Sequence, residues 1–149
     1  MAGQAVEPFL KDGIPDGAII FSHSSGAAEV ADAVLGIAPS DLIILRVMIG
    51  RGTVADGTCV SFLKECPSGI APSATSGTGY QKITADADNE AGANSTAELA
   101  LAVDGNGVPN TNIVKSGSAI VLDTSSTSTA LTDLHCTVIA LPQNGRKVS

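Results

Sequence analysis

The stretch Leu42-Ile-Ile-Leu-Arg-Val-Met-Ile49 decides the fold class of this 149-residue chain. Apolar residues, many of them β-branched, fill all but one of its positions, and Gly50 and Gly52 follow it. An apolar run of this length that ends at glycine is typical of a buried strand. We therefore expect a central β-strand over residues 42–49, around which the other elements assemble.

The next apolar run, Thr58-Cys-Val-Ser-Phe-Leu-Lys64, predicts a second strand. Between the two runs, Ala55-Asp56-Gly57 is a turn signal. Strands joined by a short loop that contains glycine commonly pair with each other. The sequence therefore predicts a hairpin between 42–49 and 58–64.

Further strand signals lie on both sides of this pair. They cover 17–21, 80–85, 97–103, 112–115, 119–123 and 131–141. Turn signals separate them, among them Asp104-Gly-Asn-Gly107 and Ser116-Gly-Ser118, while Ser22-His-Ser-Ser-Gly26 is expected to end the first strand. Seven or eight short strands with turns between them predict an all-β fold, either an antiparallel β-sandwich or a jelly-roll-like barrel.

Two stretches leave the secondary structure open. Residues 27–35 place Ala27, Val30, Ala31, Val34 and Leu35 at helical spacing, but an irregular strand fits them as well. Residues 97–103 alternate cleanly yet contain good helix formers. At most one short helix is expected, over 27–35, and it would end before Pro39 because the residue before a proline avoids helical geometry.

The chain divides into an arm and one domain. Residues 1–16 contain two prolines and an Asp-Gly pair, and they predict an extended N-terminal arm with apolar anchors at Val6, Phe9 and Leu10. Residues 17–149 have the size of a single β domain. Within it, the Pro-, Ser- and Gly-rich stretch 67–79 predicts a long surface loop.

The charge and hydropathy exclude several partners. A formal charge of −7 is the wrong sign for a nucleic-acid surface, which needs clustered Lys and Arg. The longest apolar runs are far shorter than the roughly 18 residues of a membrane span. The first residues lack the basic and apolar regions of a signal peptide. These features predict synthesis in the cytoplasm and no nucleic-acid or membrane partner.

Residues equipped for catalysis are scarce: the chain has 2 His, 1 Tyr, 3 Phe and no Trp. No Gly-x-Ser-x-Gly elbow or phosphate-binding loop occurs. The acidic run Asp86-Ala-Asp-Asn-Glu90 starts like a calcium loop, but Ala91 and Ala97 stand where that loop needs Gly and Glu. We expect a protein that is not an enzyme and that has no cofactor.

The odd number of cysteines, at Cys59, Cys66 and Cys136, argues against a complete disulfide framework. The favoured interpretation is three buried, reduced thiols, and one disulfide with a free thiol is the alternative. A zinc site from these cysteines and His135 has the right ligand types. Its spacing is poor, because His135 and Cys136 are adjacent and would point to opposite faces of a strand.

The chain combines four features. It has a small aromatic-poor β domain, an N-terminal arm over 1–15 and a long loop over 67–79. It closes with the strands from Val114-Lys-Ser-Gly-Ser-Ala-Ile-Val-Leu-Asp123 to Leu141. In overall style it resembles the decoration, or cement, proteins of tailed-bacteriophage capsids. The resemblance implies a virion protein on the capsid surface, with the major capsid protein as partner. It also implies self-association, as a trimer, and bridging of neighbouring capsid subunits.

An arm with apolar anchors could add a strand to an exposed sheet edge of a neighbour, so Val6, Phe9 and Leu10 are the expected partner-binding residues. The competing hypothesis is a phage tail or cell-surface β-sandwich module that binds a receptor through the loop 67–79. Sugar-binding sites of that kind use exposed aromatic rings, and only Tyr80 is available there. A small metal-dependent enzyme is a third class.

Overall fold

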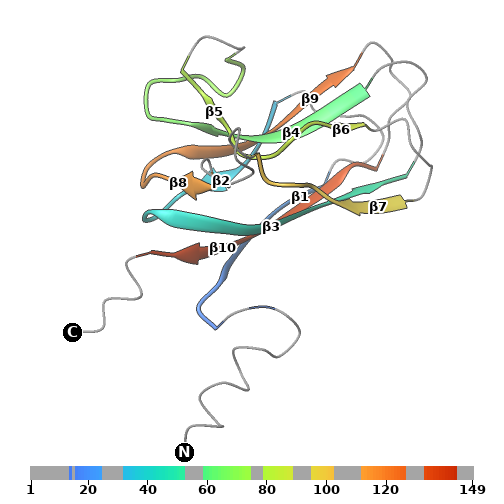
Figure 1. Cartoon of the computed structure of the whole chain (residues 1–149). Helices are drawn as coiled ribbons and strands as arrows, with labels where there is room; N and C mark the ends of the chain where they lie inside the picture. The colour runs from blue at the N-terminus through green and yellow to red at the C-terminus, as the bar shows by residue number, and fades with distance from the viewer. Residues whose placement is uncertain are drawn as a thin grey trace, which may run out of the picture.

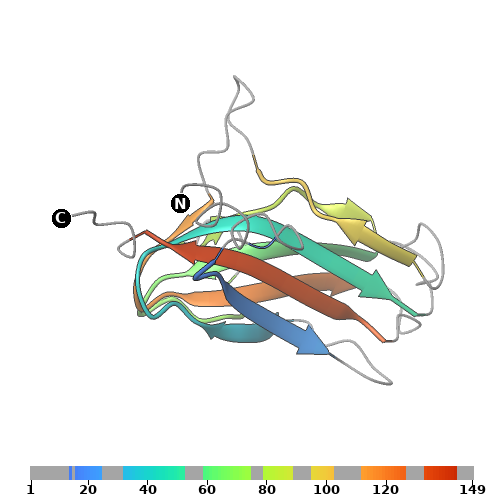
Figure 2. The same ribbon diagram turned by 90° about the horizontal axis from the view of Figure 1, so that it is seen from below.

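The structure, a computed structural model, describes residues 14, 16–24, 32–52, 59–74, 79–88, 95–102, 112–126 and 133–143. Two five-stranded antiparallel sheets pack face to face, as Figures 1 and 2 show. The predicted all-β sandwich is therefore confirmed. No helix occurs in the described parts of the chain, and so none there could cross a membrane.

The first sheet, called sheet A, is built around the strand that the sequence analysis placed at the centre. Its order is β1-β10-β3-β7, and β8 also pairs with β3. The strands are β1 (Ile19–Ser24), β10 (His135–Pro142), β3 (Leu42–Arg51), β7 (Ser95–Glu98) and β8 (Ile113–Val114). β3 is the longest strand described, and it has neighbours on both sides.

The second sheet, sheet B, has the order β2-β9-β4-β5, and β6 also pairs with β4. Its strands are β2 (Asp32–Ile37), β9 (Ala119–Ser126), β4 (Cys59–Cys66), β5 (Gln81–Lys82) and β6 (Ala87–Asp88). β1 and β2 are edge strands of the two sheets. They contact each other, so the two edges meet along one side of the sandwich.

The chain passes between the sheets in a nested order. β1 pairs with β10, β2 with β9 and β3 with β8, while β1 to β4 alternate between sheet A and sheet B. First therefore pairs with last, and second with second-last. Such nesting is what results when one long antiparallel hairpin is rolled up into two layers.

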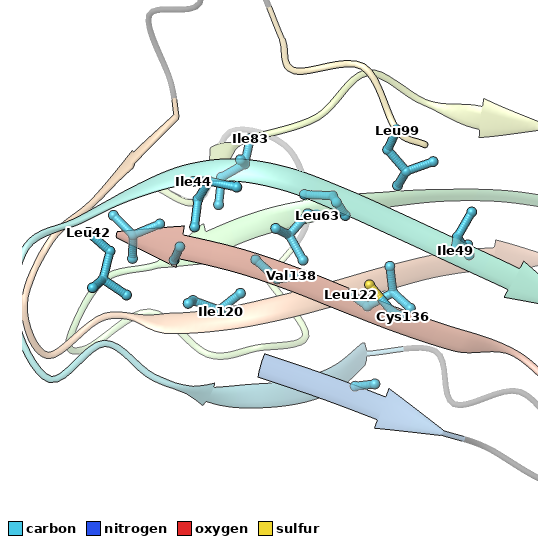
Figure 3. Packing of buried hydrophobic residues seen from close by; sticks show 14 of the residues in the cluster. Leu42, Ile44, Ile49, Leu63, Ile83, Leu99, Ile120, Leu122, Cys136 and Val138 are labelled. Carbon is cyan, nitrogen blue, oxygen red and sulfur yellow. The ribbon is translucent and has the colours of Figure 1, made fainter. Parts of the chain in front are cut away.

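The core lies between the sheets and consists of small aliphatic side chains. In Figure 3, Leu42, Ile44, Ile49, Cys136 and Val138 from sheet A face residues of sheet B. The opposing side chains are Leu63, Ile120 and Leu122. Ile83 and Leu99 close the same cluster from the segments around β5 and β7. Aliphatic residues thus build the core that aromatic side chains supply in many domains of this size.

The predicted hairpin between 42–49 and 58–64 is wrong. Both runs are strands, but β3 belongs to sheet A and β4 to sheet B. β3 is flanked by β10, β7 and β8, and β4 is flanked by β9, β5 and β6. The two runs instead face each other across the core, because both carry apolar residues that need a covering layer.

One open alternative is settled and one further local prediction is corrected. Residues 32–35, where a short helix was one of two possibilities, belong to strand β2. Side chains alternate between the two faces of this strand, and Ala33 and Leu35 pack on the core. Residues 27–31 lie outside the described residues. The first strand does not end at Ser22, since β1 continues to Ser24 by pairing with β10. Residues 87–88, within the acidic run 86–90, pair with β4 as β6.

Candidate functional site

The outer face of sheet A carries an apolar patch at one end. Ile20 pairs with Ile139, and Leu141 pairs with Ile43, which in turn pairs with Ile113. Their chain neighbours Phe21, Ala140, Leu42 and Val114 pack on or belong to the core, so alternation turns these five side chains outward. We call Ile20, Ile43, Ile113, Ile139 and Leu141 the outer apolar patch. It is unusual, because a solvated sheet face is ordinarily polar.

The other end of the same face carries several charged and polar side chains and is slightly hollowed. Arg46, Met48, Thr96, Glu98, His135 and Thr137 are among the residues that line an open depression of about 460 Å³. The Arg46 guanidinium donates two hydrogen bonds to the Glu98 carboxylate, at 2.8 and 3.1 Å, and links β3 to β7. This pair raises the pKa of Arg46 and lowers the pKa of Glu98. Both side chains are about half exposed, so the link contributes little to stability.

The side of the sandwich where β1 and β2 meet is the second apolar surface. Ile20, Val34 and Ile37 are 53%, 46% and 57% exposed there. Phe21 lies between these edge strands against Gly36, where a Cβ would approach the Phe21 ring to 2.7 Å. Edge strands with exposed aliphatic residues and few charges are sites where other chains add strands. The β1–β2 side therefore has the chemistry of an interaction edge.

The outer face of sheet B is closed instead by a buried ion cluster. The Lys64 side chain is fully buried, and its ammonium donates to Asp123 at 2.7 Å and to Asp32 at 3.0 Å. A third hydrogen bond, of 3.0 Å, reaches the backbone carbonyl of Ala74. Burial lowers the pKa of Lys64, but the hydrogen bonds to Asp123 and Asp32 outweigh it and raise that pKa. The cluster ties β4 to β9, to β2 and to residue 74 of the loop.

Tyr80 belongs to the same covered region. Its ring stacks on Phe62 with centroids 6.2 Å apart, and the Lys64 ammonium lies 5.0 Å from the ring centroid. The Lys82 ammonium lies over the Phe62 ring, 4.5 Å from the ring centroid. The aromatic side chain that a sugar-binding loop would need is thus engaged with its own sheet. Tyr80 is half-buried and stacked on Phe62, so it is not the freely exposed ring that the receptor-binding hypothesis needs.

The partner-binding residues expected from the sequence, Val6, Phe9 and Leu10, lie outside the described residues. The chain reaches the described region at Ile14, which is half-buried, and turns at Asp16 and Gly17 before entering β1. Gly17 has a φ of +81°, a backbone conformation that residues other than glycine rarely adopt. The described chain therefore enters β1 beside the outer apolar patch, since Ile19 pairs with Ala140.

The structure separates the residues of the hypothetical zinc site. Cys66 lies in sheet B, whereas His135 and Cys136 lie in sheet A. His135 is exposed and Cys136 is buried in the core, as the alternation predicted. No cluster of three or more His, Cys, Asp or Glu that could hold a metal is found in the part of the chain that the structure describes. The histidines do not combine either, because His23 is on β1 and points to the other face from His135.

Two cysteines occupy the positions expected of buried thiols. Cys66 and Cys136 are buried and unpaired by disulfide. Burial raises the pKa of the Cys66 thiol and raises the pKa of Cys136 to about 12. Both are therefore protonated and poor nucleophiles near neutral pH. Cys59 begins β4, and the prediction for its side chain is not tested by the described residues.

The outer apolar patch was missed by sequence reasoning, although a signal for it exists. The final strand contains Val138-Ile-Ala-Leu141 without a polar residue, so both of its faces are apolar. A strand of that kind needs cover on both sides. Only the pairing of β10 with β1 and β3 shows that Ile20 and Ile43 extend this outward surface.

The fold has counterparts among solved phage structures. A chain of the structure described as "Capsid of Ralstonia phage GP4" aligns with a TM-score of 0.51 and 13% identity, over 84% of this chain and 83% of that chain. A chain of "Cyanophage Pam1 capsid asymmetric unit" aligns with a TM-score of 0.43 and 17% identity, over 84% of each chain. This second similarity is weaker than the first. No protein-family profile and no curated sequence matches the chain.

Proposed function

We propose that this chain is a structural protein of a phage virion, which binds the outer surface of the capsid and stabilises it by bridging neighbouring subunits. The observation that carries the proposal is the shared fold with a chain of the Ralstonia phage GP4 capsid, over 84% of this chain. At 13% identity this similarity concerns the fold, and the role on the capsid is our inference from it. In this role the protein is a virion component and not an enzyme.

The surfaces of the sandwich support a role in holding proteins together. The β1–β2 side and the outer apolar patch offer aliphatic contact area, while the residues that could carry chemistry are dispersed. We also propose that the nested strand order is a jelly roll, with β1-β10-β3-β7 and β2-β9-β4-β5 as its two sheets. Double-sheet jelly rolls are frequent in viral capsids.

The arm completes the proposal. Val6, Phe9 and Leu10 are the residues we propose to contact a neighbouring subunit of the major capsid protein, by adding a strand to an exposed edge. Self-association as a trimer would multiply these contacts, because linked sites bind with avidity. A protein that binds the assembled shell and not its dissociated subunits stabilises the shell by mass action.

Co-sedimentation tests the proposal. The full chain is mixed with empty shells of the phage that encodes it, and bound protein is measured after pelleting, with dissociated capsid subunits as the control. We expect saturable binding to shells and an increase in the temperature at which the shells disrupt. Absence of pelleting, or binding to host cells instead, would contradict a capsid role and support the receptor-binding hypothesis.

A variant that lacks residues 1–12 tests the arm separately. We expect it to fold with a cooperative thermal transition of its own and to lose binding to shells. A variant with Phe9→Ser and Leu10→Ser should show the same loss without shortening the chain. Unchanged shell binding by both variants would exclude the arm as the contact and leave the capsid role to the sandwich itself.

A further inference from the structure

The outer apolar patch lies on the side of sheet A that faces away from the core. Ile139 and Leu141 are 3% and 8% exposed, yet neither belongs to the hydrophobic core between the sheets. Ile20 and Ile113 on its rim are 53% and 37% exposed. The centre of the patch is thus shielded from solvent, while its rim is open.

Among the described residues, no strand packs on this outer face. Figures 1 and 2 show sheet B covering the opposite face of β10 and β3. The outer face of sheet B presents a contrast, because there the cover is identified: Lys64 holds the loop at Ala74, and Tyr80 stacks on Phe62. On sheet A, the exposed rim at Ile20 and Ile113 is where a corresponding apolar cover can bind.

The N-terminal segment has the composition and the position for that cover. Residues 1–13 contain Val6, Phe9 and Leu10 and only two acidic and one basic side chain. They join the described chain at the half-buried Ile14, immediately before the turn that leads into β1. Thirteen extended residues span about 43 Å, whereas the four strands of the patch span only about 15 Å. The segment therefore reaches every part of the patch from its own attachment point.

We propose that residues 1–13 of the same chain seat their apolar side chains on the outer apolar patch of sheet A when the protein is free. The segment is tethered beside Ile20, so its effective concentration at its own patch exceeds that of any second copy in dilute solution. Seating buries the aliphatic rim and the anchors Val6, Phe9 and Leu10 together. In the free protein, the arm is then bound to the outer apolar patch of its own chain.

Seating has a consequence for the function proposed above, although it does not depend on that function. If the same anchors bind the capsid shell, the seated arm competes with the shell. The apparent affinity for shells then falls in proportion to the fraction of arms that are free. A variant that weakens the seat should bind shells more tightly than the natural chain.

Photo-crosslinking of the full chain tests the seat without any shell. Phe9 is replaced by the photoreactive analogue p-benzoylphenylalanine, and the irradiated protein is digested and mapped by mass spectrometry. We expect crosslinks to peptides of β1, β3, β8 or β10 that contain patch residues. An equal mixture of ¹⁵N-labelled and unlabelled protein should give crosslinks within one isotopic chain only.

Matched variants sharpen the result. Ile113→Ser removes an exposed patch residue and should lower the crosslink yield by about tenfold, because burial of one aliphatic side chain is worth about that factor or more. Val34→Ser, at similar exposure on sheet B, is the control and should leave the yield unchanged. Crosslinks between heavy and light chains would overturn the proposal in favour of a second copy. Crosslinks confined to sheet B, or none at all, would overturn it outright.

Discussion

The Lys64 ammonium lies 2.7 Å from the Asp123 carboxylate, and the lysine side chain is fully buried although it points away from the hydrophobic core. Two carboxylates and the carbonyl of Ala74 accept its three hydrogen bonds. A buried charge is tolerated only when it is paired and hydrogen-bonded in this way. Lys64 therefore joins β4 to β2 and β9 through the two carboxylates, and it holds the loop at Ala74 onto sheet B.

The first prediction concerns this pair. Asp123→Ala should lower the free energy of unfolding by about 3 kcal/mol, because it leaves the buried ammonium with one carboxylate instead of two. Glu98→Ala breaks the exposed ion pair with Arg46 and should cost less than about 1 kcal/mol. Urea unfolding of both variants measures the difference. Equal, small losses would mean that Lys64 is hydrated and does not depend on Asp123.

The second prediction concerns the contact between Gly36 and Phe21. A methyl group at Gly36 would come within 2.7 Å of the Phe21 ring, so Gly36→Ala should cost about 1–3 kcal/mol by forcing the ring to move. For a domain of this size, a loss of that order lowers Tm by roughly 2–4 °C per kcal/mol. Differential scanning calorimetry detects a shift of this size.

Gly50→Ala is the control for that substitution. Its added methyl group would lie 3.8 Å from its nearest neighbours, His135 and Thr96, which is an ordinary contact. We expect a change of Tm within about 2 °C of zero. In the Gly36→Ala background, Phe21→Leu should recover part of the loss. A Gly36→Ala variant as stable as the natural chain would show that Phe21 does not pack there in solution.

The third prediction concerns pH. Asp41 accepts a hydrogen bond from the backbone amide of Ser116 at 2.9 Å, which lowers the pKa of Asp41, with Lys115 contributing. A lowered folded-state pKa means that the stabilisation is present above the unfolded value of about 3.9. It is lost as pH falls through the lower folded-state value. The stability gap between the natural chain and Asp41→Asn should therefore be constant at neutral pH and close below about pH 4.

Urea unfolding of both proteins between pH 7 and pH 3 measures this gap. A gap that persists unchanged at pH 3 would mean that Asp41 acts through packing and not through its charge. Asp123, a partner of Lys64, is left intact in both proteins, so its contribution cancels in the comparison.

The fourth prediction concerns the thiols. With a pKa of about 12, Cys136 is ionised at pH 8 in on the order of one molecule in ten thousand, and it is also buried. Iodoacetamide should therefore leave Cys66 and Cys136 unmodified in the native protein and alkylate both in urea. Peptide mass spectrometry follows each cysteine separately. Rapid native alkylation of Cys136 would mean that the sandwich opens at β10.

The positions of the main strands could be predicted from the sequence, because strand formation depends on neighbouring residues. The run 42–49 became β3, and most of β10 lies in the run 131–141, because both contain stretches of consecutive apolar side chains that must be buried. The turn at Ser116 and Gly117 is also present, and Gly117 adopts the positive φ of 83° that favours glycine. The partners of these strands were not predictable in the same way. The run 58–64 follows β3 in sequence, yet it pairs with β9, about 60 residues away.

The residues of the candidate surfaces were likewise predictable only where they are neighbours in the sequence. Val6, Phe9 and Leu10 were predicted as apolar anchors from the sequence; they lie outside the described residues, and their role stays a prediction. The outer apolar patch was not recognised, because Ile20, Ile113 and Ile139 come from separate parts of the sequence and are brought onto one face only through strand pairing. The Lys64 cluster was missed for the same reason, since its carboxylates come from β2 and β9.

The sequence by itself determined that this chain is all-β and has an aliphatic core, because strand formation follows from the alternation and branching of neighbouring side chains. It also determined that residues able to carry chemistry are few. Only the tertiary structure decided which strands share a sheet, which outward residues gather into a patch, and that Lys64 is buried. Those outcomes depend on pairings between distant segments, whose free energies come from the whole packed sandwich and not from any single stretch.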